Sequence, residues 1–163
     1  MKNSLFKGEI MSIAIIEKNI NDIELIKPLW EQLNALHCEK SMNFKKRFET
    51  YEFEKRMEGI IQKAERGIIK LDILFDDEKN KYAGYCLSSI EDCKGEIESI
   101  FIEKEYRKSG QGGKLMESAL RWFNDKNIYD IKINVVYNNS DALPFYERYG
   151  FKISNYILSR PVN

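Results

Sequence analysis

Short runs of branched apolar residues alternate with longer amphipathic stretches along this chain. The isoleucine-rich run Ser12 to Ile16 predicts a first strand. Apolar positions at helical spacing then predict a helix capped by Asn21 or Asp22. Pro28 falls inside that pattern, so we expect a kink or a late helix start near it.

A polar loop from Lys40 to Lys46 separates this helix from a second one, expected over Phe48 to Ala64 and ended by Gly67. Three strand-like runs follow, joined by polar turns, and they favour an antiparallel meander. These runs are Ile68 to Phe75, Tyr82 to Ile90 and Glu96 to Ile102.

The last third of the chain alternates helix and strand: a helix from Gly112 to Lys126, a strand from Ile131 to Tyr137, a short helix from Ala142 to Tyr149 and a last strand from Phe151 to Leu158. The predicted order is β-αα-βββ-α-β-α-β. At a prior of about 150 residues per domain, the length indicates a single α/β domain over residues 11–163. Residues 1–10 are interpreted as an N-terminal extension.

Charge and cysteine usage exclude several classes of protein. The 26 Lys and Arg residues balance the 26 Asp and Glu residues, whereas a general nucleic-acid binder carries a basic excess. Cys38, Cys86 and Cys93 cannot all pair within one chain, and with a single histidine they fit no common zinc pattern. We expect three reduced thiols in a cytoplasmic protein, with no metal, no signal peptide and no membrane span.

A glycine-rich segment stands between the meander and the next helix; it reads Glu105-Tyr106-Arg107-Lys108-Ser109-Gly110-Gln111-Gly112-Gly113-Lys114. Glycines allow close approach to a ligand, and a helix start favours an anion. Three basic side chains make the segment suitable for a pyrophosphate, although a plain strand-to-helix turn explains it about as well. The segment lacks the ending of a P-loop, and it does not open a βαβ unit as a dinucleotide-binding turn does.

A second segment of this kind, Asn139 to Phe151, begins where the preceding strand ends. One helix and one strand separate it from Gly110. Turns connected in this way lie side by side at the same end of parallel strands, where open α/β sheets bind ligands.

Together these segments resemble the GCN5-related N-acetyltransferase (GNAT) family. The family's acetyl-CoA signature, Arg/Gln-x-x-Gly-x-Gly/Ala, reads Arg107 to Gly112 here, and Ile97 to Ile102 is similar to its fourth strand. The later motif is similar to Asn139-x-x-Ala142-x-x-x-Tyr146 followed by Gly150-Phe151. The resemblance implies a mixed, largely antiparallel sheet flanked by helices, with a parallel pair splayed at the acetyl-CoA site.

The departures from the family pattern are small. Gly113 adds a glycine after the usual motif, and Pro144 interrupts the short helix. Pro144 lies in the first turn, where a missing N–H costs little, so the site is not placed in doubt.

The resemblance also implies which residues hold the cofactor. The backbone of Ile100, Phe101 and Ile102 is expected to pair with the pantetheine arm, and one of these N–H groups to face the thioester oxygen. The pyrophosphate is expected on Arg107, Lys108, Ser109, Gly110, Gln111, Gly112, Gly113 and Lys114.

Two residues of the later motif receive roles in the same way. Tyr146 is expected to contact the cofactor and to protonate the leaving thiolate; a tyrosine packed by its ring is the alternative. Asn139 is expected to bond the pantetheine or to orient the strand end. A turn asparagine that bonds its own backbone explains Asn139 equally well.

Acetyl transfer to an amine requires the neutral nucleophile, which is only about one molecule in 2,500 at pH 7 for an ammonium with a pKa of ~10.4. Glu98 is the first candidate base, because some members of the family carry a catalytic glutamate there. Glu96 is the second, since it shares that face if the strand alternates without a bulge. Solvated strand glutamates, or a base acting through a water chain, are the alternatives. His37 is a weaker candidate, better explained as a histidine favourable to a helix C-terminus.

We therefore expect an acetyl-CoA-dependent N-acetyltransferase that acts by direct attack of a primary amine in a ternary complex. A non-catalytic acyl-CoA-binding or sensing module is the alternative. The acceptor is expected to be a small-molecule or peptide amine, and neither nucleic acid nor membrane is an expected partner. The exposed edge of the last predicted strand favours a homodimer. Four aromatic residues flank the region where the family builds its acceptor pocket, although core packing also explains them: Trp30, Phe44, Phe48 and Tyr51.

Overall fold

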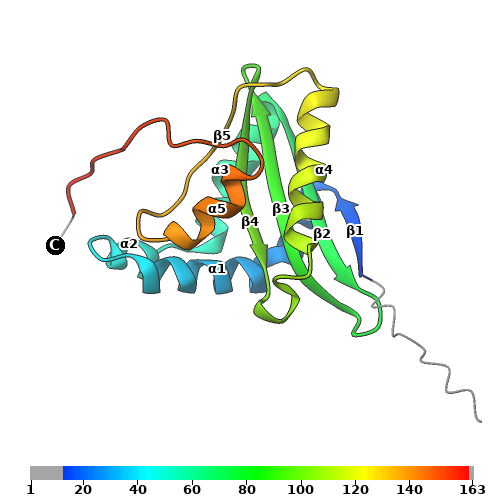
Figure 1. The fold of residues 1–163 in the computed structure, drawn as a ribbon, viewed down its shortest axis with the longest axis horizontal. Coiled ribbons are helices and arrows are strands. Elements are labelled where there is room, and N and C mark those ends of the chain that lie inside the picture. The colour runs from blue at the N-terminus through cyan, green and yellow to red at the C-terminus, as the bar shows by residue number, and fades with distance from the viewer. Residues whose placement is uncertain (1–12, 162–163) are drawn as a thin grey trace, which may run out of the picture.

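The computed structural model describes residues 13–161. In that range the chain forms one sheet with the strand order β1-β2-β3-β4-β5 and helices on both faces (Figure 1). Only β4 and β5 run parallel, and the other neighbours are antiparallel. This is the mixed, largely antiparallel sheet that the resemblance implied. The strands are β1 (Ile13–Lys18), β2 (Ile68–Asp76), β3 (Lys81–Glu91), β4 (Lys94–Ile102) and β5 (Ile131–Ile133). The predicted extension, residues 1–10, lies outside the described range.

The helices fall largely where the apolar spacing predicted them. The α-helices are α1 (Lys27–Lys40), α2 (Lys45–Glu49), α3 (Phe53–Arg66), α4 (Gln111–Asp125) and α5 (Leu143–Glu147). Short 3₁₀ helices precede α1, α4 and α5; they are η1 (Ile20–Ile26), η2 (Lys104–Tyr106) and η3 (Ser140–Ala142).

The first helical segment begins earlier than predicted. Asn19, not Asn21 or Asp22, is its N-cap: the Asn19 side chain accepts the Asn21 N–H at 3.0 Å, and the Asp22 carboxylate accepts the Asn19 N–H at 3.3 Å. This reciprocal pair is a capping box. Pro28 lies in the first turn of α1, so the late start of the α-helix is confirmed.

The helix predicted over Phe48 to Ala64 is two helices. α2 ends at Glu49, and the Thr50 hydroxyl bonds back to the Lys46 carbonyl at 3.0 Å. Such a side-chain bond competes with helix continuation. α2 buries no residue, whereas α3 buries an apolar face. The helix therefore restarts at Phe53, where core packing stabilises it.

The core lies in two layers, one on each face of the sheet. α1 and α3 pack with η1 on one face, against Leu71, Ile73, Tyr85, Leu87 and Phe101. α4 covers the other face, where Leu115, Met116, Ala119 and Phe123 meet Cys86 and Ile97. Phe145 of α5 approaches Gly112 at the start of α4.

The two strands predicted near the C-terminus are the main errors. The strand expected over Ile131 to Tyr137 is paired only from Ile131 to Ile133. The strand expected over Phe151 to Leu158 is absent, because residues 151–161 form neither helix nor strand. Four large apolar side chains of this segment are more than half exposed: Ile153, Tyr156, Ile157 and Leu158. The alternation of apolar residues predicted two strands here, but residues 134–137 and 151–158 have no strand partner in this fold.

Candidate acetyl-CoA site

The parallel strands β4 and β5 stay together over only three residue pairs. Pairing runs from Gly95↔Ile131 to Ile97↔Ile133, although β4 continues to Ile102. The two strands therefore part before β4 ends, and the later β4 backbone has no strand partner on its β5 side among the described residues. We call the space between the parted strands the opening. The candidates Ile100 and Ile102 lie on this part of β4, partly buried against the α4 layer. Such an edge can pair with an extended ligand.

A left-handed turn carries the chain from β4 into α4. Lys108 has φ +61° and Gly110 has φ +81°, and α4 begins at the next residue, Gln111. The Lys114 N–H makes a bond to the Gly110 carbonyl at 3.1 Å. Earlier N–H groups at a helix start have no intrahelical partner and point outward. With the helix dipole behind them, they suit a phosphate.

The side chains of the turn serve mainly to build it. Arg107 Nε donates to the Ile102 carbonyl at 2.8 Å, and its guanidinium lies over the Phe101 ring. Ser109 Oγ donates to the Tyr106 carbonyl at 2.7 Å. Two of the residues predicted to bind the pyrophosphate, Arg107 and Ser109, thus have polar atoms engaged within the turn itself.

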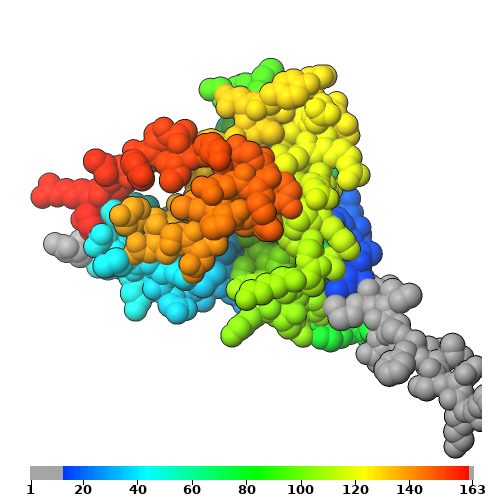
Figure 2. Space-filling view, viewed as in Figure 1, coloured from blue at the N-terminus to red at the C-terminus, as the bar shows by residue number. Residues whose placement is uncertain are grey.

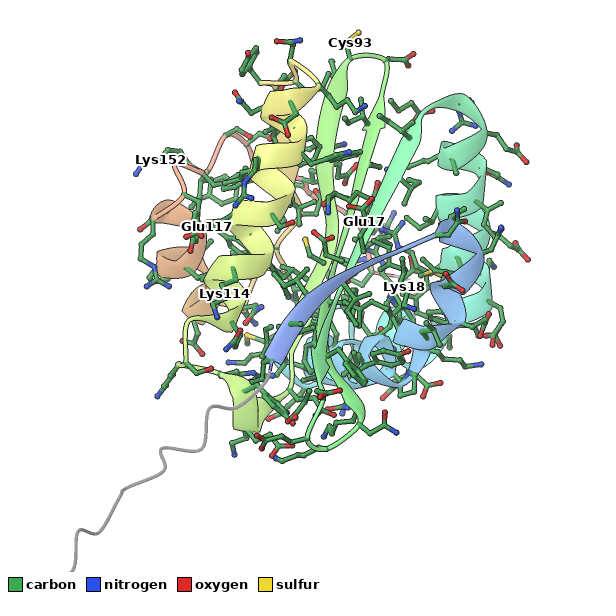
Figure 3. The ribbon with its side chains drawn as sticks, turned by 90° about the vertical axis from the view of Figure 1, so that its right-hand side faces the viewer. Glu17, Lys18, Cys93, Lys114, Glu117 and Lys152 are labelled. Carbon is green, nitrogen blue, oxygen red and sulfur yellow. The ribbon has the colours of Figure 1, made fainter. Side chains whose placement is uncertain are left out.

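Lys114 lies elsewhere. Its side chain lines a groove of about 400 Å³ together with Glu17, Lys70 and Asp72. Glu17 on β1 and Lys114 on α4 lie on the same side of the molecule (Figure 3). Lys70 in this groove pairs with the carboxylates of Glu17 and Asp72.

The later motif lies next to the start of α4. A Cβ added to Gly112 would come within 3.5 Å of the Phe145 ring, and one added to Gly113 within 2.7 Å of the Tyr149 hydroxyl. Gly113 thus allows the turn after α5 to pack closely on α4, whereas a Cβ at Gly112 would make only an ordinary contact with Phe145. The surface is recessed between α1, α5 and the start of α4 (Figure 2).

Tyr146 lies half-buried in α5, with its ring against Phe145 and Phe151. Burial, with a smaller contribution from the nearby Cys86 thiol, raises the pKa of Tyr146 to about 12. The hydroxyl therefore keeps its proton at neutral pH. Asn139 is the N-cap of η3 but makes no side-chain cap bond.

Glu98 and Glu96 both pair with Lys63 of α3, so neither carboxylate is free. Glu98 accepts bonds from Arg56, Lys63 and Ser89, and its side chain is only 1% exposed. Glu96 pairs with Lys63 at 2.9 Å. Arg56 and Lys63 were not singled out from the sequence. The two residues are seven positions apart, which places them on one face of α3. This spacing was the sequence feature that could have indicated a shared partner.

His37 lies in the last turn of α1, as expected, with its ring 5.6 Å from that of Phe48. Burial lowers its pKa, the opposite of a helix-dipole effect. Trp30, Phe48 and Tyr51 line a pocket of about 430 Å³ between α1 and the α2–α3 segment. Phe44 instead stacks under the Arg47 guanidinium.

Among residues 13–161, no group of three His, Cys, Asp or Glu side chains is arranged to hold a metal ion. None of the helices in this range combines the length and apolarity that crossing a membrane requires.

The residues present fit an extended, phosphate-bearing cofactor. The outward N–H groups of this helix start supply donors, and the β4 edge supplies further backbone groups. The chain is therefore an α/β protein in which two parallel strands separate next to a helix start that suits an anion.

The family follows from a direct comparison. The model of the acetyltransferase (GNAT) family matches residues 30–151, and this chain belongs to that family.

Solved structures share the fold. A putative acetyltransferase from Pyrococcus furiosus is similar with a TM-score of 0.69 at 20% identity, covering 92% of this chain and 99% of that one. The PaiA N-acetyltransferase from Thermoplasma acidophilum, solved in complex with coenzyme A, has a TM-score of 0.68 at 24% identity, covering 90% and 94%. Glucosamine-6-phosphate N-acetyltransferase from Arabidopsis thaliana has a TM-score of 0.61 at 16% identity, covering 93% and 99%.

Proposed function

We propose that this chain is an acetyl-CoA-dependent N-acetyltransferase that transfers the acetyl group to a primary amine by direct attack in a ternary complex. The observation that carries the proposal is the separation of β4 from β5 beside the glycine turn that opens α4. The coenzyme A bound to the similar Thermoplasma protein supports this choice of cofactor.

Acetyl-CoA supplies an activated thioester. The N–H groups at the start of α4 bind the pyrophosphate, and the backbone of Ile100 to Ile102 orients the pantetheine arm. An N–H of this strand also faces the thioester oxygen, where a donor stabilises developing negative charge.

Tyr146 acts as the general acid in this proposal. Its hydroxyl is protonated at neutral pH and can give its proton to the departing thiolate, although the pKa of about 12 makes it a weaker acid than an ordinary tyrosine. The acceptor approaches from the α1–α3 side of β4, which carries Glu98 and Glu96. The acceptor is a small-molecule or peptide amine, and the protein works in the cytoplasm.

The test is a thiol-release assay with acetyl-CoA and a panel of amines, including diamines, amino acids and N-terminal peptides. We expect amine-dependent release of CoA with at least one member. Gly110→Val is the matched negative variant, because a β-branched residue is strained at φ +81°. It should lose both turnover and CoA binding. CoA binding by the wild type without thiol release for any amine would favour the non-catalytic acyl-CoA-binding module.

A further inference from the structure

β4 has one residue more than β3 at the place where β4 leaves β5. The register runs from Ser88↔Ile97 to Leu87↔Ser99, so Glu98 is the extra residue between them. Ile97 is also the last residue of β4 that pairs with β5. A β-bulge bends its strand and increases the local twist. The β4 backbone therefore changes course at Glu98, where the two parallel strands separate.

Both carboxylate oxygens of Glu98 accept hydrogen bonds from neighbouring side chains. Arg56 Nη2 donates to Oε2 at 2.7 Å, Ser89 Oγ donates to Oε1 at 2.5 Å, and Lys63 Nζ also donates to Oε1. Arg56 and Lys63 both belong to α3. A buried carboxylate is tolerated only when it is paired and hydrogen-bonded, so Arg56 and Lys63 of α3 hold the side chain of the bulge residue in place.

The same network reaches the other margin of the opening. Lys63 Nζ also donates to Glu96 Oε2 at 2.9 Å. Glu96 Oε1 accepts from Asn134 Nδ2 at 2.8 Å, and Asn134 is the first residue after β5. Lys63 therefore connects α3 with the bulge of β4 and, through Glu96, with the chain that leaves β5.

We propose that Glu98, Arg56 and Lys63 are positioning residues, whose ion pairs fix the β4 bulge and so the width of the opening that receives the pantetheine arm. The inference rests on the proposed function, because the network can affect catalysis only if the cofactor binds in this opening. Glu98 then acts through the backbone it holds, and it is not the general base.

The chemistry of Glu98 agrees with this role. Burial alone would raise the pKa of Glu98, but hydrogen bonds from Lys63, Ser89 and Arg56 outweigh burial and hold the pKa below its usual value. A carboxylate with a low pKa accepts a proton poorly from an ammonium group whose pKa is ~10.4. At 1% exposure, its oxygens are also shielded from an incoming amine.

Glu98→Gln separates the two roles, because it removes the charge and keeps the shape. Positioning predicts that the Kd for CoA and the KM for acetyl-CoA rise, and that turnover falls by up to about 100-fold because a reacting group is misplaced. It also predicts that turnover falls by a factor that stays constant with pH. A general base predicts unchanged CoA affinity and a loss greatest at low pH, recovering toward the amine's own pKa. That second result would overturn the inference.

Variants of the partners make the test independent of Glu98 itself. Lys63→Met should weaken CoA binding, Lys63→Arg should restore most of it, and Lys55→Met, an exposed lysine on the same helix, should leave it unchanged. The double variant Lys63→Met with Glu98→Gln should bind CoA better than the product of the two single losses, because the residues are coupled.

Ser89→Ala provides a milder variant in case a charge change prevents folding. It removes one donor to Glu98 and should raise the Kd for CoA several-fold. Circular dichroism and thermal melting confirm that each variant is folded. Failure of the wild type to bind CoA would refute the proposed function. CoA affinities equal to that of the wild type in all folded variants would refute only the positioning role.

Discussion

Tyr146 is the side chain of α5 whose chemistry burial changes most. Its pKa of about 12 lies above the ordinary value of 10, because the ionised ring would lose hydration. A general acid must still carry its proton when the thiolate leaves. Tyr146 meets this requirement throughout the neutral and mildly alkaline range.

Tyr146→Phe removes one hydroxyl and keeps the ring that packs against Phe145 and Phe151. We expect turnover to fall by roughly 10²–10⁴, the usual contribution of a general acid, where chemistry limits the rate. The affinity for CoA should change little. Steady-state kinetics with a direct CoA titration checks both. Full turnover, with thiol release shown to be rate-limiting, would remove Tyr146 from the mechanism.

His37 supplies a pH test of stability. Its pKa is lowered by burial, so the unfolded chain takes up this proton at a higher pH than the folded chain does. The stability associated with neutral His37 is complete above its ordinary pKa of about 6.5 and is lost as the pH falls through that value. We expect His37→Gln to unfold with a flatter pH dependence between pH 7.5 and 5.5. Urea unfolding of both proteins at each pH measures the difference, and parallel curves would contradict it.

At the scale of elements, α1, α3, α4 and the β2–β4 meander could be predicted because each has a long, periodic apolar face. The break at Thr50 could not be predicted, because it depends on which helical turns pack against the core. The same limit applies to residues 151–158, whose apolar pattern is that of a strand. The bulge at Glu98 was also missed, because one extra residue is visible only against the register of β3.

The candidate site was predicted where motifs are local and missed where partners come from other elements. The positive φ at Gly110 agrees with the glycine requirement read from the sequence. The Lys114 side chain lies in the groove beside Glu17 of β1, and Glu98 forms ion pairs with residues of α3. Both placements depend on how β1 and α3 pack against the rest of the fold. Such pairings are set by the tertiary fold, which no local spacing encodes.

Gly59 is an interior residue of α3 where a side chain would cost nothing. A Cβ built there meets no atom within 4 Å. Since glycine in a helix interior is less favourable than alanine by about 0.5–1 kcal/mol, we expect Gly59→Ala to increase the free energy of unfolding by that amount. Urea denaturation is the measurement. A decrease would mean that α3 needs the flexibility of glycine at this position.

At the scale of the whole molecule, the sheet ends in β1 and β5. The dimer was expected at the edge of a strand over Phe151 to Leu158, which residues 151–161 do not form. We still expect a homodimer, because an open strand edge can pair with a second copy. Sedimentation across a concentration series checks this, and a monomer at every concentration would refute it.

The three residue pairs that hold β5 to β4 also have a dynamic consequence. Local opening takes the least free energy where the fewest cooperative interactions must break. Amide protons of β5 should therefore exchange with solvent sooner than those of β3, which is paired along its length on both sides. Exchange of this kind would show that the outer strand opens locally while the rest of the sheet stays folded.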